Sequence, residues 1–331
     1  MKKALLTAAV TSVGLLISGQ SLAQGYYVDE QSALRLGDAF SGGSASASDA
    51  STVFYGPAAM TLVKDEIVFN IAAIDFSSSF DGSATTVGGA PINGKDAEAD
   101  SLDALPSFYM VRELSDGFKM GVYINAPYAT GTDFGDDSVA RYQAAESDIT
   151  GIDAGFALAF RINDMVSVGG SLIAQYVNAK TAVAINSTAI CLGAEAAGEL
   201  GPYDCAALGI DAAELGNTTY DGYFEMEGHN MGYGFALGTL IEFTPDSRLG
   251  INYRSRIAHQ LSGTAEATFP AAAAGFTSLA GLPDTTASGK VTLTTPETAS
   301  LSYFHRLGKI ALQADYSWTK WSRYNTDGQG S

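Results

Sequence analysis

The residues that could do chemistry are few, and each group lacks a part that its chemistry needs. Gly89–Lys95 reads GAPINGK and fits the first part of a phosphate-binding loop. The next residue is Asp96, whose carboxylate repels phosphate and offers no hydroxyl to Mg²⁺. His229, His259 and His305 lack the spacing of metal ligands, and the chain has no G-x-S-x-G nucleophile motif. We therefore expect no enzyme, no cofactor and no metal site.

Two pairs of residues remain as candidates for a defined role. Cys191 and Cys205 lie in one predicted loop, and two cysteines in one loop of an exported chain are expected to form a disulfide. Arg254 and Arg256 share one face of a predicted strand and could attract a ligand carboxylate. The alternative is that the two arginines pair with acidic residues of a plug.

The elements that carry these residues are β-strands with one apolar face, and residues 151–162, GIDAGFALAFRI, are the clearest case. The even positions, from Ile152 to Ile162, are apolar, and nearly all of them are bulky, while the odd positions are small or charged. A period of two indicates a β-strand, and the run is long enough to cross a bilayer with a tilt. In an outer-membrane barrel the apolar face touches lipid, whereas in a soluble β-sandwich it would face a core.

Similar runs recur along the chain, and two features favour lipid over a core. The second face of the runs carries Asp, Asn, Gln, Glu and Arg together with many glycines, which suits a wet or plugged lumen, and aromatic residues stand at run ends, where an interfacial girdle lies. Short turns also alternate with long connections at 77–101, 127–147, 177–224 and 258–288, which is the layout of an outer-membrane barrel. The runs cover residues 66–76, 105–112, 119–126, 151–162, 166–176, 230–243, 249–256, 291–303 and 309–318.

The composition and the N-terminus agree with this fold class. The chain of 331 residues has 18 Lys and Arg against 36 Asp and Glu, a net charge of −18, which argues against a nucleic-acid partner. Lys2 and Lys3 precede an apolar stretch that ends in a small-x-small site at Ala23, so residues 1–23 are predicted to be a signal peptide. Residues 24–64 are rich in Gly, Ser and Ala without a clean period, and residues 65–331 are predicted to form the barrel.

The count of about nine runs is odd, whereas single-chain bacterial barrels have an even number of strands. The last residues, 325–331, have a loop composition. We therefore predict an all-β, antiparallel transmembrane β-barrel that is C-terminally truncated, with long extracellular loops at 184–223 and 258–288.

Six sequence blocks follow one another in a specific order and spacing: LGDAFSG at 36–42, YGPA at 55–58, GVYINAPYATGTDF at 121–134, YRS at 253–255, TTPE at 294–297 and YSWTKWS at 316–322. Together they resemble the FadL family of outer-membrane transporters for long-chain fatty acids and aromatic hydrocarbons (the OMPP1/FadL/TodX type). The resemblance implies a 14-stranded barrel plugged by an N-terminal hatch, which is expected here at residues 24–64. Gly56 stands where the family has Asn of an Asn-Pro-Ala motif, and Val183 stands about where a basic residue for a carboxylate is expected. The substrate could therefore be a neutral hydrocarbon as well as a fatty acid.

The resemblance also implies a mechanism of lateral diffusion. Ligand is caught outside, enters the barrel and leaves sideways where the third strand kinks. Pro127 gives a local reason for the kink, because proline donates no hydrogen bond to a neighbouring strand and therefore marks a break in a strand. The alternative is that Pro127 only ends the third strand. The expected gate and hatch residues are Gly56, Pro57, Ala58, Asn125, Ala126, Pro127 and Tyr128.

The resemblance further implies that the two long loops form an outer apolar groove that catches the ligand. Pro270 suits the first turn of a helix and Pro283 its end, which places Phe269, Phe276 and Leu279 near one helix face. The alternative is that the loops pack only on each other. The expected ligand-binding residues are Phe269, Phe276, Leu279, Leu208, Ile210, Arg254 and Arg256.

Two other functions stay open on the sequence. One is a general porin or surface adhesin that uses the barrel as an anchor, and the other is an outer-membrane lipid hydrolase. The expected location is the outer membrane of a Gram-negative bacterium. The expected partners are outer-membrane lipid and lipopolysaccharide, a hydrophobic small-molecule ligand and the outer-membrane assembly machinery, with the protein a monomer that binds no nucleic acid.

Overall fold

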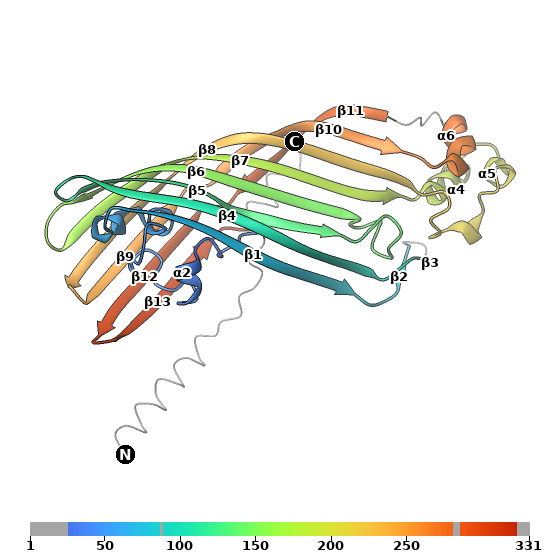
Figure 1. The fold of residues 1–331 in the computed structure, drawn as a ribbon. Coiled ribbons are helices and arrows are strands. Elements are labelled where there is room, and N and C mark those ends of the chain that lie inside the picture. The colour runs from blue at the N-terminus through green and yellow to red at the C-terminus, as the bar shows by residue number, and fades with distance from the viewer. Residues whose placement is uncertain (1–25, 87–88, 281–284, 323–331) are drawn as a thin grey trace, which may run out of the picture.

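A computed structural model describes residues 26–86, 89–280 and 285–322, and its main element is one antiparallel sheet of 11 long strands that curls around the N-terminal segment (Figure 1). The predicted signal peptide, residues 1–23, lies outside the described residues. No helix in the described part of the chain is long and apolar enough to cross a membrane. The strands of the sheet are β1 (Glu66–Phe80), β4 (Ala97–Ser115), β5 (Phe118–Asp133), β6 (Glu146–Arg161), β7 (Val166–Ile185), β8 (Gly222–Thr244), β9 (Ser247–Arg254), β10 (Ile257–Thr268), β11 (Thr285–Thr295), β12 (Thr298–Leu307) and β13 (Ile310–Thr319).

Strands that are neighbours in sequence are neighbours in space through most of the sheet, in the order β1-β4-β5-β6-β7-β8-β9-β12-β13. A separate two-stranded hairpin is made of β2 (Ala84–Thr85) and β3 (Pro91–Ile92). The short helices fall into two groups. The N-terminal group is α2 (Ala33–Leu36), α3 (Thr52–Tyr55) and the 3₁₀ helix η1 (Pro57–Leu62); the loop group is α4 (Ser187–Ala197), α5 (Asp204–Ala207), η2 (Ala212–Glu214), η3 (Ala271–Ala273) and α6 (Ala274–Ala280).

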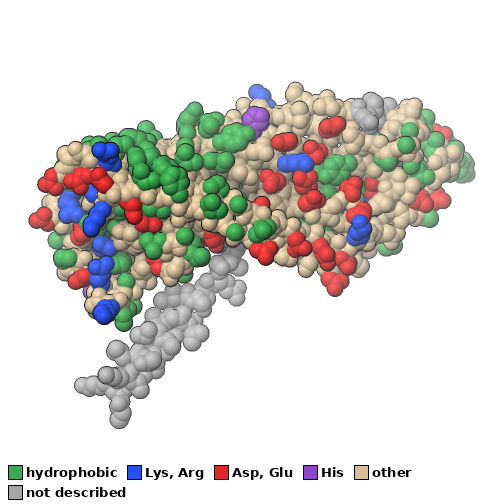
Figure 2. All heavy atoms as spheres, viewed as in Figure 1, with side chains coloured by type: hydrophobic (Ala, Val, Ile, Leu, Met, Phe, Trp, Pro, Cys, Tyr) green, Lys and Arg blue, Asp and Glu red, His purple; other side chains and the backbone are tan. Residues whose placement is uncertain are grey.

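The alternation predicted for residues 151–162 is confirmed in β6. From Gly151 to Phe160 the odd residues are buried and the even ones are exposed. Exposed apolar side chains of β1 and β5–β8 continue the same band, and Figure 2 shows hydrophobic side chains gathered toward the end with the short turns. Acidic side chains are spread over the half that carries α4–α6, and at the end with the short turns they lie among Lys and Arg (Figure 2). The apolar outside of the sheet is the face that lipid would cover.

Two strands of the meander are broken at the same level. β9 and β10 both pair with β8 and are separated by Ser255 and Arg256, while β11 and β12 are separated by Pro296 and Glu297. Ser255 bridges its break, because its amide donates to the Phe235 carbonyl at 2.8 Å and its hydroxyl accepts from the Phe235 amide at 2.9 Å. Counting each broken pair as one strand gives the nine runs of the sequence.

The predicted loop boundaries are wrong in part. The loop expected at 258–288 contains β10 and the start of β11, so the connection is only residues 269–284. The loop expected at 184–223 begins after Ile185 and ends before Gly222. The physical reason is that the outward residues of β10 are Ala258, Gln260 and Ser262, so the strand lacks the bulky apolar outer face that indicates a membrane strand.

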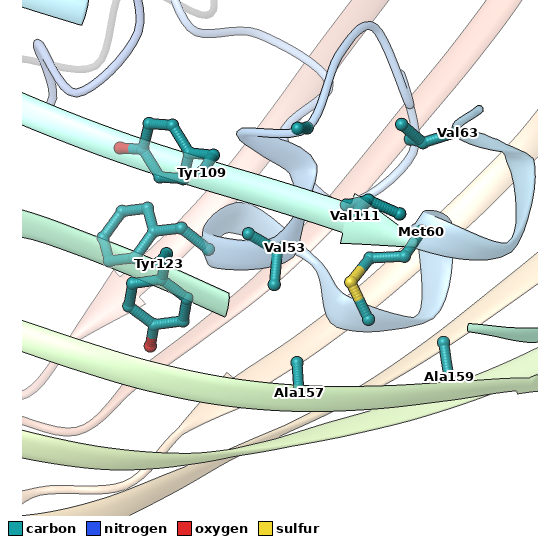
Figure 3. Packing of buried hydrophobic residues seen from close by; sticks show 10 residues of the cluster. Val53, Met60, Val63, Tyr109, Val111, Tyr123, Ala157 and Ala159 are labelled. Carbon is teal, nitrogen blue, oxygen red and sulfur yellow. The ribbon is translucent and has the colours of Figure 1, made fainter. Parts of the chain in front are cut away.

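The N-terminal segment, residues 26–63, is the hatch, and it packs against the inner face of the sheet. Val53 and Met60 lie against Tyr109, Tyr123 and the small residues of β6 (Figure 3). Lumen-face glycines make room for it. A Cβ on Gly169 would lie 2.6 Å from the Ala58 amide nitrogen, one on Gly238 would lie 3.2 Å from the same nitrogen, and one on Gly250 would lie 2.1 Å from the Ser44 carbonyl oxygen. Gly169 and Gly238 are cross-strand partners, so together they form the surface on which Pro57 and Ala58 rest.

The inside of the hatch is organised by Arg35, which is fully buried. Its guanidinium donates to the Ser46 hydroxyl at 2.5 Å and to the Phe40 and Ser41 carbonyl oxygens at 2.8 and 2.6 Å. It also stacks over the Tyr55 ring, 4.7 Å from the centroid. Burial raises the pKa of the Tyr55 phenol, so this group stays neutral and donates to the Asp29 carbonyl at 3.0 Å. These bonds satisfy the polar backbone of an irregular segment inside the sheet.

Candidate functional site

The wall of the sheet has a seam between β4 and β5. Their ladder runs from Ser115↔Phe118 to Phe108↔Ile124 and ends there. Beyond that point β4 continues on β1 as far as Ala97, and β5 continues on β6 as far as Asp133. A bulge shifts the β5–β6 register between Asn125 and Tyr128, at the position of Pro127. The break predicted for Pro127 is therefore present, and the strand continues beyond it.

Hatch residues 26–31 fill the seam on the β5 side. Tyr27 forms a β-bridge with Tyr128, the Val28 amide donates to the Pro127 carbonyl at 2.9 Å, and the Ala129 amide donates to the Tyr26 carbonyl at 3.0 Å. Gln31 is 2% exposed, and its side-chain amide bonds both the amide and the carbonyl of Ala126. The N-terminal segment thus supplies the backbone partners that β4 does not.

An apolar layer lies at the same level inside the sheet. It is formed by Tyr26, Tyr128, Ile149, Val177, Leu261 and Leu293, with Trp321 packed against it. The Tyr26 ring is 5.5 Å from the Tyr128 ring and 5.3 Å from the Trp321 ring. Burial raises the pKa of the neighbouring Tyr27 phenol well above its ordinary value, so no charge is placed in this layer.

Above this layer, toward α4–α6, lies a cavity of about 310 Å³. Lumen-facing side chains of β6, β7, β8, β10 and β11 line it, and they are mostly apolar or hydroxylic. Lys180, next to Ala179 on β7, points to the opposite, outward face, where its ammonium lies 2.8 Å from Glu146 and 3.2 Å from Glu225. The lumen-facing lining includes Ser147, Ile149, Ala179, Met226, Leu261 and Leu293.

Below the apolar layer lies a buried polar layer. Arg254 forms an ion pair with Asp153, and both side chains are less than a tenth exposed. Gln175 donates to Asp153 at 2.7 Å and accepts from the Thr295 hydroxyl at 2.8 Å, and its oxygen lies 2.9 Å from the His259 Nε2. From α4–α6 toward the turns, the lumen is therefore a cavity, an apolar layer, a polar layer and the body of the hatch.

The two candidate arginines, Arg254 and Arg256, lie in different environments. Arg254 pairs with an acidic residue of the sheet itself, so the expectation that its partner would come from the plug is wrong. Arg256 lies in the break after β9 and is exposed, so the shared lumen face predicted for Arg254 and Arg256 is also wrong. The reason is local: the break resets the alternation two residues after Arg254.

The loop helices form their own small core rather than an open groove. Cys191 and Cys205 are joined by a disulfide, with their Cα atoms 6.0 Å apart, and both pack on Ile210 and Phe276. Phe276 and Ile210 are fully buried, so the expectation that they line a groove is wrong. Leu208 packs on the same cluster and against Gly275, Leu279 is half-exposed, and Phe269 lies apart from them against Gly222.

Breaking this disulfide is expected to loosen the loop helices without disturbing the sheet. Closing a loop of this length contributes about 3 kcal/mol in the chain-entropy model. Reduction with dithiothreitol should therefore speed hydrogen exchange in α4 and α6 while β6 and β7 stay protected, as read by mass spectrometry. A Cys191→Ser/Cys205→Ser variant is the control, because its exchange should already be fast and should not respond to the reductant. Equal protection of α6 in both proteins would contradict the prediction.

The loops above the cavity are tied together by Arg141. Its guanidinium bonds Asp221 and the Gly216 carbonyl at 2.7 and 2.6 Å, and the Tyr142 hydroxyl bonds the same carboxylate at 2.7 Å. Burial raises the pKa of the Asp221 carboxyl, and the hydrogen bonds from Arg141 and Tyr142 oppose that rise. The mouth of the lumen is thus held by a buried ion pair and a tyrosine.

The gate and hatch residues named from the sequence lie at two places. Gly56, Pro57 and Ala58 lie over the β7–β8 glycine pair, while the stretch from Asn125 to Tyr128 forms the bulge at the seam. A Cβ on Gly56 would lie 2.6 Å from the Ser44 Cα, so an Asn here could not fit without movement of the hatch.

Sequence reasoning missed Gln31, which lies in a segment without periodicity. It also missed the pairing of Asp153, although Asp153 has the lumen parity that its partner requires.

In the described part of the chain, no group of three or more His, Cys, Asp or Glu residues could hold a metal ion. The lumen offers instead an apolar cavity, a polar floor and a seam at the level of the outer apolar band. Such a site can hold a small apolar molecule, because apolar side chains and a few hydroxyls line its walls.

Comparison with known proteins agrees with this architecture. The chain is 27% identical over 337 residues to the long-chain fatty acid transport protein of Escherichia coli O6:H1, covering 98% of this chain and 72% of that protein. It is 25% identical over 331 residues to outer membrane protein P1 of Haemophilus influenzae, covering 93% of this chain and 68% of that protein.

Solved structures show the same fold. A Pseudomonas aeruginosa FadL homologue matches with a TM-score of 0.78 at 22% identity, over 91% of this chain and 70% of that one. The toluene transporter TbuX of Ralstonia pickettii matches with a TM-score of 0.53 at 17% identity, over 83% of this chain and 68% of that one. The family model described as outer membrane protein transport protein (OMPP1/FadL/TodX) matches residues 14–326. The plugged, curled sheet described above thus belongs to a member of the OMPP1/FadL/TodX family of outer-membrane transport proteins.

Proposed function

We propose that this protein carries hydrophobic small molecules through the outer membrane and releases them sideways into the lipid through the β4–β5 seam. The observation that carries the proposal is the seam itself. It begins at the level of exposed Ile71, Ile124 and Ile152, and on its inner side it meets the apolar layer under the cavity. A molecule held in the cavity thus has an apolar route to lipid that avoids the polar floor and the body of the hatch and is closed by hatch residues 26–31.

The cavity favours ligands without a full negative charge. The one basic residue beside the cavity, Lys180, points to the outward face of β7 and is bonded there to Glu146 and Glu225. Among the described residues that line the cavity, no other carries a positive charge that a ligand carboxylate could meet. Relatives are named for long-chain fatty acids and for toluene, so both classes are candidate substrates here, and an uncharged hydrocarbon suits the described lining better.

Filling the cavity is the test. Ala179→Phe places a ring in the cavity from β7, so uptake of radiolabelled toluene and oleate should fall by about tenfold, the loss that corresponds to ~1.4 kcal/mol of binding free energy. Uptake is measured in cells whose own hydrophobic-uptake protein is deleted and whose outer membrane carries the full chain.

Ala174→Phe is the matched control. It makes the same change on the same strand, five residues earlier and on the opposite, outward face. Its uptake should equal that of the unmodified protein. If both variants lose uptake equally, or if only small polar solutes pass, the proposal is overturned.

A further inference from the structure

The side-chain amide of Gln31 bonds the backbone of one β5 residue, Ala126, through both its oxygen and its nitrogen. Its Oε1 accepts from the Ala126 amide at 3.2 Å, and its Nε2 donates to the Ala126 carbonyl at 2.9 Å and to the Val28 carbonyl at 3.2 Å. A primary amide that bonds both backbone groups of one residue imitates a neighbouring β-strand. These are the ladder bonds that Ala126 lacks on the side where β4 has ended.

The backbone of Gln31 faces the other side of the seam. Its carbonyl accepts from the Ser107 hydroxyl at 3.1 Å and from the Tyr109 hydroxyl at 2.8 Å, and both residues belong to β4. The Asn125 side chain of β5 in turn donates to the Tyr109 hydroxyl at 3.3 Å. One hatch residue therefore binds both edges of the seam where their ladder stops.

The segment before Gln31 has contacts of its own with β5 and with the rest of the hatch. Tyr26–Val28 pair with the far side of the bulge, and the Tyr55 hydroxyl holds the Asp29 carbonyl. Directly after Gln31, the Ser32 hydroxyl caps α2, so the body of the hatch begins at that residue. The six residues before it, 26–31, form the strip that lies in the seam.

We infer that Gln31 is the latch of the lateral exit: its side-chain amide holds the strip 26–31 against β5, and its release from Ala126 opens the seam. This assignment rests on the proposed function for its role in transport. Gln31 is a positioning residue, because it acts through the strip and the strand edges rather than through contact with the cavity.

The test variant is Gln31→Glu, which keeps the size of the side chain and removes its two donated bonds. Its carboxylate would face the carbonyl oxygens of Ala126 and Val28, which repel it. Gln31→Met removes all three bonds without adding a charge. The matched control is Gln143→Glu, which makes the same change at an exposed loop residue.

The first readout is structural and does not depend on transport. Hydrogen exchange of residues 26–31 and 125–133 in the purified full chain should quicken by about tenfold or more in Gln31→Glu, less in Gln31→Met, and not at all in Gln143→Glu. Trp321 gives a second reading in a Trp318→Phe background, because its ring lies 5.3 Å from the Tyr26 ring. Its emission should become more accessible to acrylamide when the strip leaves.

The second readout is the dissociation of oleate or toluene from the detergent-solubilised protein, which should be about tenfold faster in Gln31→Glu, in proportion to the opening measured by exchange. Faster exchange together with faster dissociation supports the latch. If Gln31→Glu binds the probe but changes neither the hydrogen exchange of the strip nor the dissociation rate of the probe, the latch assignment is overturned. If exchange quickens but even the unmodified protein retains neither probe, the structural latch stands and the proposed function falls.

Discussion

Asp153→Ala is expected to lower the free energy of unfolding by about 3–5 kcal/mol, one of the two largest effects predicted for this protein. The substitution leaves Arg254 as an uncompensated charge in a site where its side chain is only 9% exposed. Gln175 loses its acceptor at the same time, and Gln175 also connects to Thr295 and His259. The loss should appear in guanidinium unfolding of the refolded protein in detergent, followed by tryptophan fluorescence.

The double variant Asp153→Leu/Arg254→Met separates the charge from the position. Replacing both members of a buried pair by apolar residues of similar size is often neutral or stabilising, so the double variant should unfold near the midpoint of the unmodified protein. If both variants lost the same amount of stability, the polar layer would stabilise the protein through its packing and not through its paired charges. A single variant within about 1 kcal/mol of the unmodified protein would contradict the buried-pair account altogether.

The strands could be predicted from the sequence wherever the outer face meets lipid. The face in contact with lipid is apolar and the face in contact with the hatch is small or polar, and this contrast gives a clean period of two. Beyond the lipid band, the outer face no longer needs to be apolar. In β10 the larger apolar residues, Ile257 and Leu261, face inward, so the amphipathic contrast reverses and the outer face no longer indicates a membrane strand.

The hatch contacts could not be predicted in the same way, because an irregular segment has no period to interpret. The sheet residues that contact the hatch, however, include several glycines. Gly169, Gly238 and Gly250 are glycines because the hatch backbone comes too close for a Cβ. The sequence displays these glycines, but it does not say which part of the hatch each one meets. Long-range pairs such as Gln31 with Ala126 depend on that unpredicted path.

The same limit explains the loop residues. The spacing of Phe269, Phe276 and Leu279 indicated a helix with one apolar face, and α6 is present. The spacing does not determine whether that face packs against a ligand or against another loop. The disulfide and Ile210 cover Phe276 in the loop core, whereas Leu279 stays half-exposed. An apolar pattern predicts that a face is buried and does not identify what buries it.

Gly169→Val is expected to unseat the hatch. The added Cβ would lie 2.6 Å from the Ala58 amide nitrogen and from the Pro57 carbonyl carbon, and both are backbone atoms that cannot swing aside. Overpacking of this kind costs about 1–3 kcal/mol or more, and η1 can escape it only by leaving its place on β7 and β8. Arg35, which is fully buried in the seated hatch, should then become open to trypsin.

Gly170→Val is the control, because it makes the same change at the next residue on the outward face. A Cβ there would meet the Leu237 side chain at 3.3 Å, at the end of a flexible group, so the hatch should stay seated. Trypsin followed by mass spectrometry should therefore cut after Arg35 in the Gly169 variant and spare it in the Gly170 variant, while circular dichroism finds the same β-content in both. A general loss of folding would also lower the β-content, so cleavage at Arg35 with an intact sheet identifies an unseated hatch. Protection of Arg35 in both variants would contradict the prediction, because it would mean that the hatch does not rest on these glycines.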